Sequence, residues 1–228
     1  MTSIMSSQQT ILEIKNEYTN LLISTLEQEM YVGFKSVYNE ATNTKYDLEN
    51  VEYRGDIPNI YILFQYFLGS IKNWTNEIIQ QELTRIKEVT HTKNTFDNLI
   101  KVVVKSHIIF LTQSRNSSNY QNFYNTMDSG KFLHQCYLSC ARKFYKNPAL
   151  FGENNSQNEQ EILNVIADGI YDSIKQFLPL ELVLNDYLNS DQIVGTVGVE
   201  TIQIPSVSVT AGCPMDNLPL ATATVIKN

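Results

Sequence analysis

Cysteine, glycine and proline are all scarce in this sequence, and each scarcity excludes a class of protein. The three cysteines, Cys136, Cys140 and Cys213, are an odd number and unevenly spaced. This pattern fits a reducing compartment better than a disulfide framework. With 9 Gly, 6 Pro and 18% charged residues in 228, the chain is not composed like a disordered protein. Its 43% hydrophobic residues are enough for a folded core.

Positive charge and long apolar runs are scarce as well. The 17 Lys and Arg residues against 24 Asp and Glu give a net charge of −7. Nucleic-acid binding depends on clustered basic residues, so we expect no nucleic-acid partner. Residues 1–10 hold no positive charge and no apolar run typical of a secretion signal. The apolar stretch Ile57–Ile71 is interrupted by Asn59 and Gln65. It is shorter than the roughly 20 residues of a membrane span, so we expect neither a signal peptide nor a span.

Motifs of common enzyme classes are absent from the sequence too. There is no glycine-rich nucleotide-binding loop, no H-E-x-x-H pair and no nucleophile elbow. Glu77, Glu82 and Glu88 fall among Lys and Arg, as on a solvated helix face. We therefore expect a non-enzymatic protein with no catalytic residues, no metal ligands and no cofactor.

Four cysteine and histidine positions nevertheless have to be tested as chemical sites. Cys136 and Cys140 share a helix face, and His134 is near in sequence, but a zinc site needs a second pair of ligands. Two buried, small, apolar residues are the better interpretation of the cysteines. His107 falls on an apolar stripe, where a buried histidine paired with a backbone or hydroxyl group is expected more often than a catalytic base.

One basic group is interleaved with aromatic residues, in the run CYLSCARKFYKNPALF. Its members are Arg142, Lys143 and Lys146 with Tyr137, Phe144 and Tyr145. Such a group can contact phosphates and stack on bases. A helix of this length also needs a polar outer side, and we favour a solvated or protein-contacting face.

Hydrophobic periodicity predicts an all-α fold. Apolar residues recur at steps of three and four along 11–38, 58–70, 73–89, 96–111, 128–145 and 161–177, with a short segment at 180–188. Asn43 to Gly55, Ser114 to Asn122 and Gly152 to Gln160 are predicted loops. No alternating strand pattern is present in this part. We predict one helical domain, residues 1–189, formed by a single bundle of roughly five to seven helices.

The last part of the chain, residues 190–228, differs in composition. The final aromatic residue is Tyr187, and β-branched residues punctuated by Gly and Pro follow. These residues predict an extended, β-prone C-terminal arm rather than a helix. A segment of this kind packs on its own body or adds to another subunit. The candidate partner-binding residues in the arm are Val197, Val199, Ile202, Ile204, Val207 and Val209.

Four segments resemble a helical family of nucleocytoplasmic large DNA viruses whose mechanism is uncharacterised. They are Phe64–Trp74, Ile78–Ile86, Leu99–His107 and Cys136–Phe151. The similarity covers roughly residues 10–190 and is strongest in W-x₃-I-I-x₂-E-x₃-I and C-A-R-K-F-Y-K-N-P-x-L-F. Trp74, Arg85 and Arg142 match the family pattern. The resemblance implies structural roles for them, as an aromatic anchor and two charges that hold helices together.

The resemblance implies a viral structural protein without catalytic activity. Its expected function is that of a minor capsid, or cement, component that binds neighbouring capsid proteins through its helical body and C-terminal arm. The expected location is the virion, after synthesis in the host cytoplasm. The alternative is a viral adaptor or packaged core factor outside the shell. Salt-stripped capsids would contain the protein in the first case only.

Overall fold

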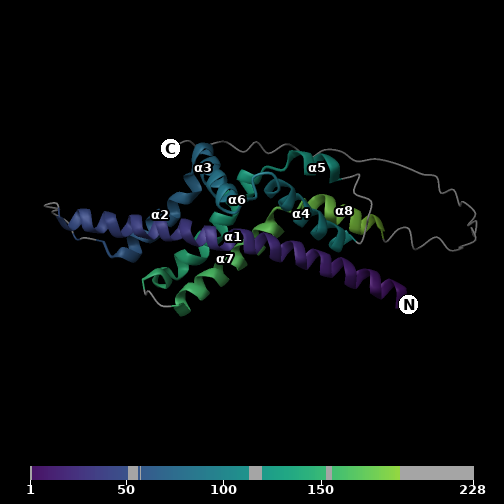
Figure 1. Ribbon diagram of the computed structural model, residues 1–228, viewed down its shortest axis with the longest axis horizontal. Coiled ribbons are helices and arrows are strands. Elements are labelled where there is room, and N and C mark those ends of the chain that lie inside the picture. The colour runs from purple at the N-terminus through teal and green to yellow at the C-terminus, as the bar shows by residue number, and fades with distance from the viewer. Residues whose placement is uncertain (1, 51–55, 57, 113–119, 153–155, 191–228) are drawn as a thin grey trace, which may run out of the picture.

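The computed structural model describes residues 2–50, 56, 58–112, 120–152 and 156–190. These residues form eight α-helices, α1 to α8, with short 3₁₀ segments and no strand among them (Figure 1). The predicted all-α fold is confirmed, with more helices than the five to seven expected. The predicted arm, apart from Ser190 at the end of α8, lies outside the described residues. The arm candidates Val197, Val199, Ile202, Ile204, Val207 and Val209 lie outside them too.

Helix α1, Thr2–Asn50, is the longest element and the axis of the fold. Its 49 residues span about 74 Å at the usual rise per residue. Leu22, Leu26, Met30 and Phe34 recur every four residues and are fully buried against the other helices. The loop predicted from Asn43 onwards is wrong up to Asn50, because the helix continues there. An ion pair between Lys45 and Glu49, one turn apart at 3.5 Å, supports this polar extension.

Helices α2, Ile60–Ser70, and α3, Asn76–Val89, are separated by a bend. The Asn59 side chain caps α2 by accepting a hydrogen bond from the Tyr61 N–H at 3.0 Å. Pro58 therefore precedes the helix, which begins two residues later than the predicted segment 58–70. The 3₁₀ segment η1, Ile71–Asn73, turns the chain, and Thr75 caps α3.

Helix α4, Phe96–Thr112, packs on α1, and helix α8, Leu180–Ser190, packs on α4. The short helix α5, Gln121–Thr126, begins inside the predicted loop 114–122. Helix α6, Ser129–Lys146, is capped by Asp128, whose carboxylate accepts from the backbone of Gly130 and Lys131. It contacts α2, α3 and α7 and is, after α1, the second centre of the fold.

The 3₁₀ segment η3, Pro148–Phe151, leads from α6 towards α7, Ser156–Gln176. The predicted loop 152–160 is shorter than expected, because α7 already begins at Ser156. Helix α7 packs on both α6 and α1. Its predicted apolar stripe is confirmed, since Ile162, Ile166, Ile170 and Ile174 are all buried. None of the helices in the described part of the chain is long and apolar enough to cross a membrane.

A continuous row of aromatic rings joins α1, α2, η3 and α6 in the core. The Phe34 ring lies 5.1 Å from Tyr137 and 4.9 Å from Phe144, measured between centroids. Phe151 continues the row at 5.0 Å from Phe144 and 5.1 Å from Phe64. Edge-to-face pairs of this kind add to the stabilisation from area burial. The aromatic content of the body is therefore largely a property of its core.

Candidate protein-binding surface

The two cysteines of α6 are buried against α7. Cys136 and Cys140 are fully buried, and the Cys140 Sγ lies 3.7 Å from the Ile166 carbonyl oxygen. Burial raises the pKa of Cys136 to about 12. Among the described residues no three His, Cys, Asp or Glu side chains gather as metal ligands would. The cysteines thus have the packing role that their shared helix face suggested.

His134 is held away from these cysteines by a different set of contacts. Its Nε2 donates to the Ile71 carbonyl oxygen at 2.8 Å, and its ring stacks on Trp74 with a centroid separation of 6.1 Å. Trp74 also contacts Tyr137 at 4.9 Å between centroids. Trp74 therefore anchors the bend after α2 on α6, as the resemblance implies.

His107 on α4 is buried and paired with a hydroxyl of α1. Its Nε2 lies 3.0 Å from the Thr19 Oγ1, and that hydroxyl donates its hydrogen to the Lys15 carbonyl oxygen at 2.7 Å. Because the hydroxyl hydrogen is already used, Nε2 carries the ring hydrogen and donates it. Burial, with the positive charges of Lys15 and Lys175, lowers the pKa of His107 to about 4. His107 is thus a neutral contact between α1 and α4.

Acid is expected to weaken the fold through His107. The unfolded chain takes up this proton near pH 6.5, whereas the folded chain takes it up only near pH 4. Stability from this site is therefore present above pH 6.5 and lost as the pH falls towards 4. Allowing for solvent screening, the free energy of unfolding falls by about 1–2 kcal/mol. Denaturant unfolding at pH 7 and pH 4.5 measures this difference.

Replacing His107→Gln keeps a donor for Thr19 and removes the titration. Between pH 7 and pH 4.5, the free energy of unfolding of the variant should fall by about 1–2 kcal/mol less than that of the wild type. His91→Asn is the matched control, because His91 is exposed and has a φ of 54°, which asparagine tolerates. Equal pH dependence of His107→Gln and the wild type would show that His107 is not the group responsible.

Arg85 of α3 joins three helices through its guanidinium group. It donates to the Glu29 carboxylate at 2.7 Å and to the Glu29 carbonyl oxygen at 2.9 Å, both on α1. Two further hydrogen bonds of 2.8 Å reach both oxygens of Glu82. The Tyr137 hydroxyl of α6 donates to the same Glu82 carboxylate at 2.5 Å. We call Arg85, Glu29, Glu82 and Tyr137 the Arg85 clasp.

The clasp changes two interpretations of the sequence. Glu82 is not on a solvated face, since its side chain is only 17% exposed. Glu77 and Glu88 are exposed, as expected. Arg85 holds helices together, as the resemblance implies, whereas Arg142 is exposed and forms no ion pair within the described residues. Burial and the Glu82 carboxylate raise the pKa of Tyr137 well above its ordinary value, so its hydroxyl stays a donor.

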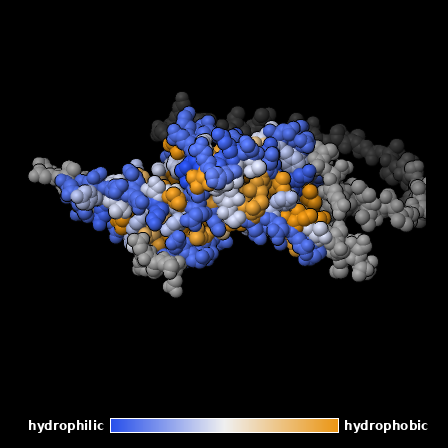
Figure 2. All heavy atoms as spheres, viewed as in Figure 1, coloured by the Kyte–Doolittle hydropathy of each residue, from blue (hydrophilic) through white to orange (hydrophobic). Residues whose placement is uncertain are grey.

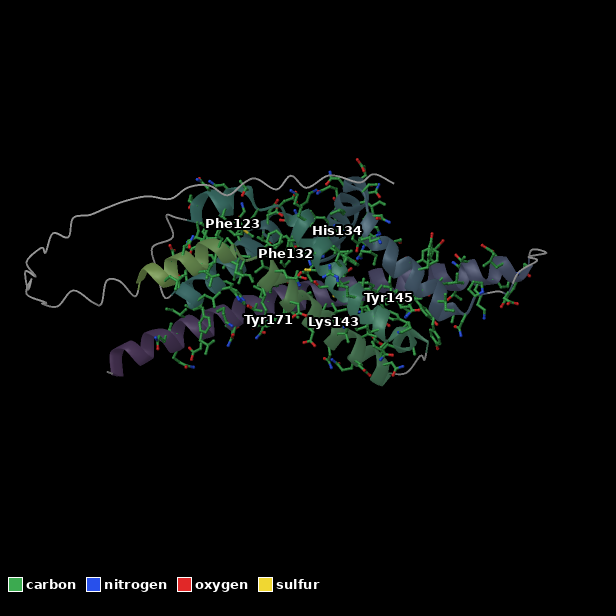
Figure 3. The ribbon with its side chains drawn as sticks, turned by 180° about the vertical axis from the view of Figure 1, so that it is seen from behind. Phe123, Phe132, His134, Lys143, Tyr145 and Tyr171 are labelled. Atoms are coloured by element: carbon green, nitrogen blue, oxygen red, sulfur yellow. The ribbon has the colours of Figure 1, made fainter. Side chains whose placement is uncertain are left out.

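The basic and aromatic run near the end of α6 is divided between the core and the surface. Tyr137, Phe144 and Phe151 are buried, and only Tyr145 of its four aromatic rings is exposed. Lys143 pairs with Asp172 of α7 at 2.9 Å. Figure 3 shows Lys143 and Tyr145 towards one end of α6 and His134 towards the other. Most of the aromatic area of this run is therefore part of the core.

Tyr145 instead lines a hollow between α2 and the end of α6. The hollow has a volume of about 480 Å³, and we call it the aromatic hollow. It is lined by Ile62, Gln65, Tyr66, Gly69, Lys72 and Tyr145, among others. The Gln65 side chain donates to the Tyr145 carbonyl oxygen at 2.8 Å, so two residues that line the hollow connect α2 and α6.

The side chains around the aromatic hollow are unusually exposed for their type. Tyr66 is 71% exposed, Ile62 59% and Tyr145 52%. They lie on the outer side of α2 and α6, opposite buried residues such as Phe64 and Leu68. A cluster of exposed apolar residues marks an interaction surface. Tyrosine in particular is enriched among residues that dominate binding energy.

The surroundings of the aromatic hollow are positively charged. Lys72 lines it, Lys146 follows Tyr145, and Arg142 lies one turn before Tyr145 on α6. All three are exposed and form no ion pair within the described part of the chain. In an acidic protein, this local excess of cations favours a partner that carries carboxylates.

The sequence of α2 contains more apolar residues than its buried stripe requires, and this excess could have indicated the surface. Residues 60–70 are apolar on nearly every side, with Ile62 and Tyr66 in addition to the buried stripe. A helix that is apolar all round is usually covered on every side. Since one apolar side of α2 is exposed at the surface, we expect that side to contact another molecule.

Fold and surface together define an all-α protein built on one long helix, with an exposed aromatic surface suited to protein contacts. A family model matches residues 8–152, more than half of the chain, so the chain belongs to a family of unknown function (DUF5764). The matched region contains both the Arg85 clasp and the aromatic hollow. No curated protein and no solved structure matches the chain.

Proposed function

We propose that this chain is a non-enzymatic structural protein of a large DNA virus. In this proposal it is a minor capsid, or cement, component that binds neighbouring capsid proteins in the virion. The observation that carries the proposal is the aromatic hollow, an exposed surface with apolar and cationic side chains. The resemblance of four sequence segments to a viral family supports the viral setting.

The chemistry of the aromatic hollow defines the neighbour that it would bind. Tyr66, Ile62 and Tyr145 supply apolar area with few rotatable bonds, which costs little entropy to order. Lys72 and Lys146 would pair with carboxylates at the rim. The proposed occupant is therefore a capsid protein that presents an apolar side chain flanked by Asp or Glu.

The uses of the reactive side chains agree with a structural role. His107 is neutral and paired, Cys136 is buried with a raised pKa, and Arg85 makes four hydrogen bonds within the clasp. Each of these groups stabilises helix packing. The apolar side chains that are exposed around the aromatic hollow are suited to binding a protein partner.

Incorporation into virus particles tests the proposal. We expect the double variant Tyr66→Ser/Tyr145→Ser to reach salt-stripped capsids at about one tenth of the wild-type level or less, since two such residues contribute over 1.4 kcal/mol. Tyr46→Ser is the matched control, because Tyr46 is 66% exposed on α1 and does not line the aromatic hollow. Quantitative mass spectrometry of purified capsids gives the readout.

The same assay addresses the arm and the alternative function. Removing residues 190–228 is expected to lower incorporation as well, because extended arms bind neighbours through backbone hydrogen bonds. Absence of the wild-type protein from stripped capsids would contradict the proposal and favour a viral adaptor or core factor. Normal incorporation of the Tyr66→Ser/Tyr145→Ser variant would contradict the assignment of the aromatic hollow.

A further inference from the structure

A second exposed apolar surface lies at the opposite end of α1 from the aromatic hollow. It is a groove of about 320 Å³ between the first half of α1 and helix α4, which we call the α1–α4 groove. Ile11, Ile14 and Tyr18 of α1 form one wall, and Val102, Lys105 and Ile109 of α4 the other. Figure 2 shows hydrophobic residues gathered over the part of the body where α4 and α8 lie beside α1.

The apolar residues of α1 in this region form two separate stripes. The buried stripe, with Thr19, Leu22 and Leu26, packs inside the molecule. The other stripe is Ile11, Ile14, Tyr18 and Leu21, spaced by three, four and three residues. Ile14 is 46% exposed, Tyr18 38% and Leu21 51%. This spacing is the heptad pattern with which a helix packs along a second helix.

A groove with two helical walls is shaped for a third helix. Helix-in-groove binding uses apolar anchors at spacings of three and four residues. The exposed stripe of α1 has this spacing itself. A second copy of α1 can therefore enter the α1–α4 groove, while the first copy enters the groove of its partner. A two-fold, parallel arrangement satisfies both grooves at once, because it places the two α4 helices on opposite sides of the α1 pair.

Charge complementarity favours this occupant. Glu17 flanks the exposed stripe of α1 on the side away from the buried stripe, and it is exposed. Lys105 is exposed at the wall of the groove formed by α4. In the parallel arrangement, Glu17 of one copy faces helix α4 of the other, so that each Glu17 meets a Lys105. The two-fold axis then gives two such ion pairs per dimer.

The first turns of α1 continue the same face. Gln8, Gln9 and Thr10 are exposed, and Figure 1 shows the N-terminal part of α1 extending beyond the neighbouring helices. A second copy would add helix packing along the exposed stripe in this part of α1.

We propose that the α1–α4 groove binds helix α1 of a second copy of this chain, forming a two-fold parallel dimer. The dimer goes beyond the proposed function, because it needs no other protein. The axis runs parallel to the two helices, so each residue of the exposed stripe lies opposite its own counterpart. The two Tyr18 side chains are then close neighbours across the axis.

Analytical ultracentrifugation of the purified full chain tests the dimer. We expect a wild-type dimer at micromolar concentration, and a dissociation constant about 30-fold or more weaker for Ile14→Asp. Val32→Asp is the matched control, because Val32 is also 46% exposed on α1 but lies outside the groove. Its dissociation constant should stay within about threefold of the wild type.

Circular dichroism verifies that both variants are folded. A wild-type monomer at 100-fold higher concentration would overturn the proposal.

A charge exchange tests the arrangement of the two copies. Lys105→Glu and Glu17→Lys should each weaken the dimer about fivefold, since each places like charges opposite one another. Combining them restores the pair with its sign reversed, and dimerisation should return towards the wild-type level. Additive weakening in the double variant would overturn the parallel arrangement.

A crosslink distinguishes a second copy from the chain's own C-terminal segment as the occupant. Tyr18→Cys in a Cys213→Ser background should give a covalent dimer with a short bismaleimide, because the two introduced thiols are neighbours. With Cys213 present, a crosslink within one chain and no covalent dimer would overturn the proposal. These measurements use the isolated protein, so they fail or succeed independently of incorporation into capsids.

Discussion

Replacing Arg85→Met is expected to lower the free energy of unfolding by about 2–4 kcal/mol. The change leaves the carboxylates of Glu29 and Glu82 without their cation, although they are only 13% and 17% exposed. It also breaks the connection between α1 and α3, which the Glu29 contacts provide. Urea unfolding followed by circular dichroism measures the difference.

The control for the Arg85→Met variant is the loss of a second ion pair, whose carboxylate is more exposed. Lys143→Met removes a pair with Asp172 in which the side chains are 34% and 40% exposed. Exposed pairs contribute little, so its loss should cost less than about 1 kcal/mol. Adding Glu29→Gln and Glu82→Gln to Arg85→Met should recover part of the stability, because the unpaired charges are then gone. An Arg85→Met variant as stable as Lys143→Met would contradict the clasp.

Replacing Gly169→Ala is expected to destabilise the fold by about 2–3 kcal/mol. In an open helix this change would instead stabilise by about 1 kcal/mol, since glycine costs backbone entropy. A Cβ atom at 169 would lie 2.3 Å from the Cys140 Sγ and 3.2 Å from the Cys140 backbone nitrogen. Because part of this obstacle is backbone, α6 and α7 must move apart.

Gly69→Ala is the matched control for this effect. A Cβ atom at 69 would meet nothing within 4 Å, so the helix gains stability, by up to about 1 kcal/mol. Gly169→Ala/Cys140→Ala should recover only part of the lost stability, since the backbone contact remains. Thermal unfolding of the variants gives the comparison. Stabilisation by Gly169→Ala would show that α6 and α7 do not approach as closely as described.

Local pattern in the sequence was sufficient to predict the helices that have one buried stripe. Helix α7 is the clearest example, because its isoleucines recur with the helical period and all face the core. The burial of Cys140 and the hydroxyl partner of His107 were also expected from position on an apolar stripe. These features depend on residues close together in the chain.

Other features depend on contacts between distant residues, which periodicity does not reveal. The end of α1 has no apolar stripe and is held by side-chain pairs such as Lys45 with Glu49. Glu82 looked solvated until Glu29, Arg85 and Tyr137 were brought together from three helices. The aromatic hollow likewise needs α2 and the end of α6 side by side.

Photo-crosslinking inside the assembled particle tests the central claim most directly, namely that the aromatic hollow binds a capsid protein. A photoreactive phenylalanine analogue placed at Tyr66 should crosslink to a capsid protein when purified particles are irradiated, with mass spectrometry to identify the attached peptide. The same group at Tyr46 should give little product, because Tyr46 does not line the hollow. Crosslinks from Tyr66 to proteins outside the shell, or none at all in particles that contain the protein, would contradict the account.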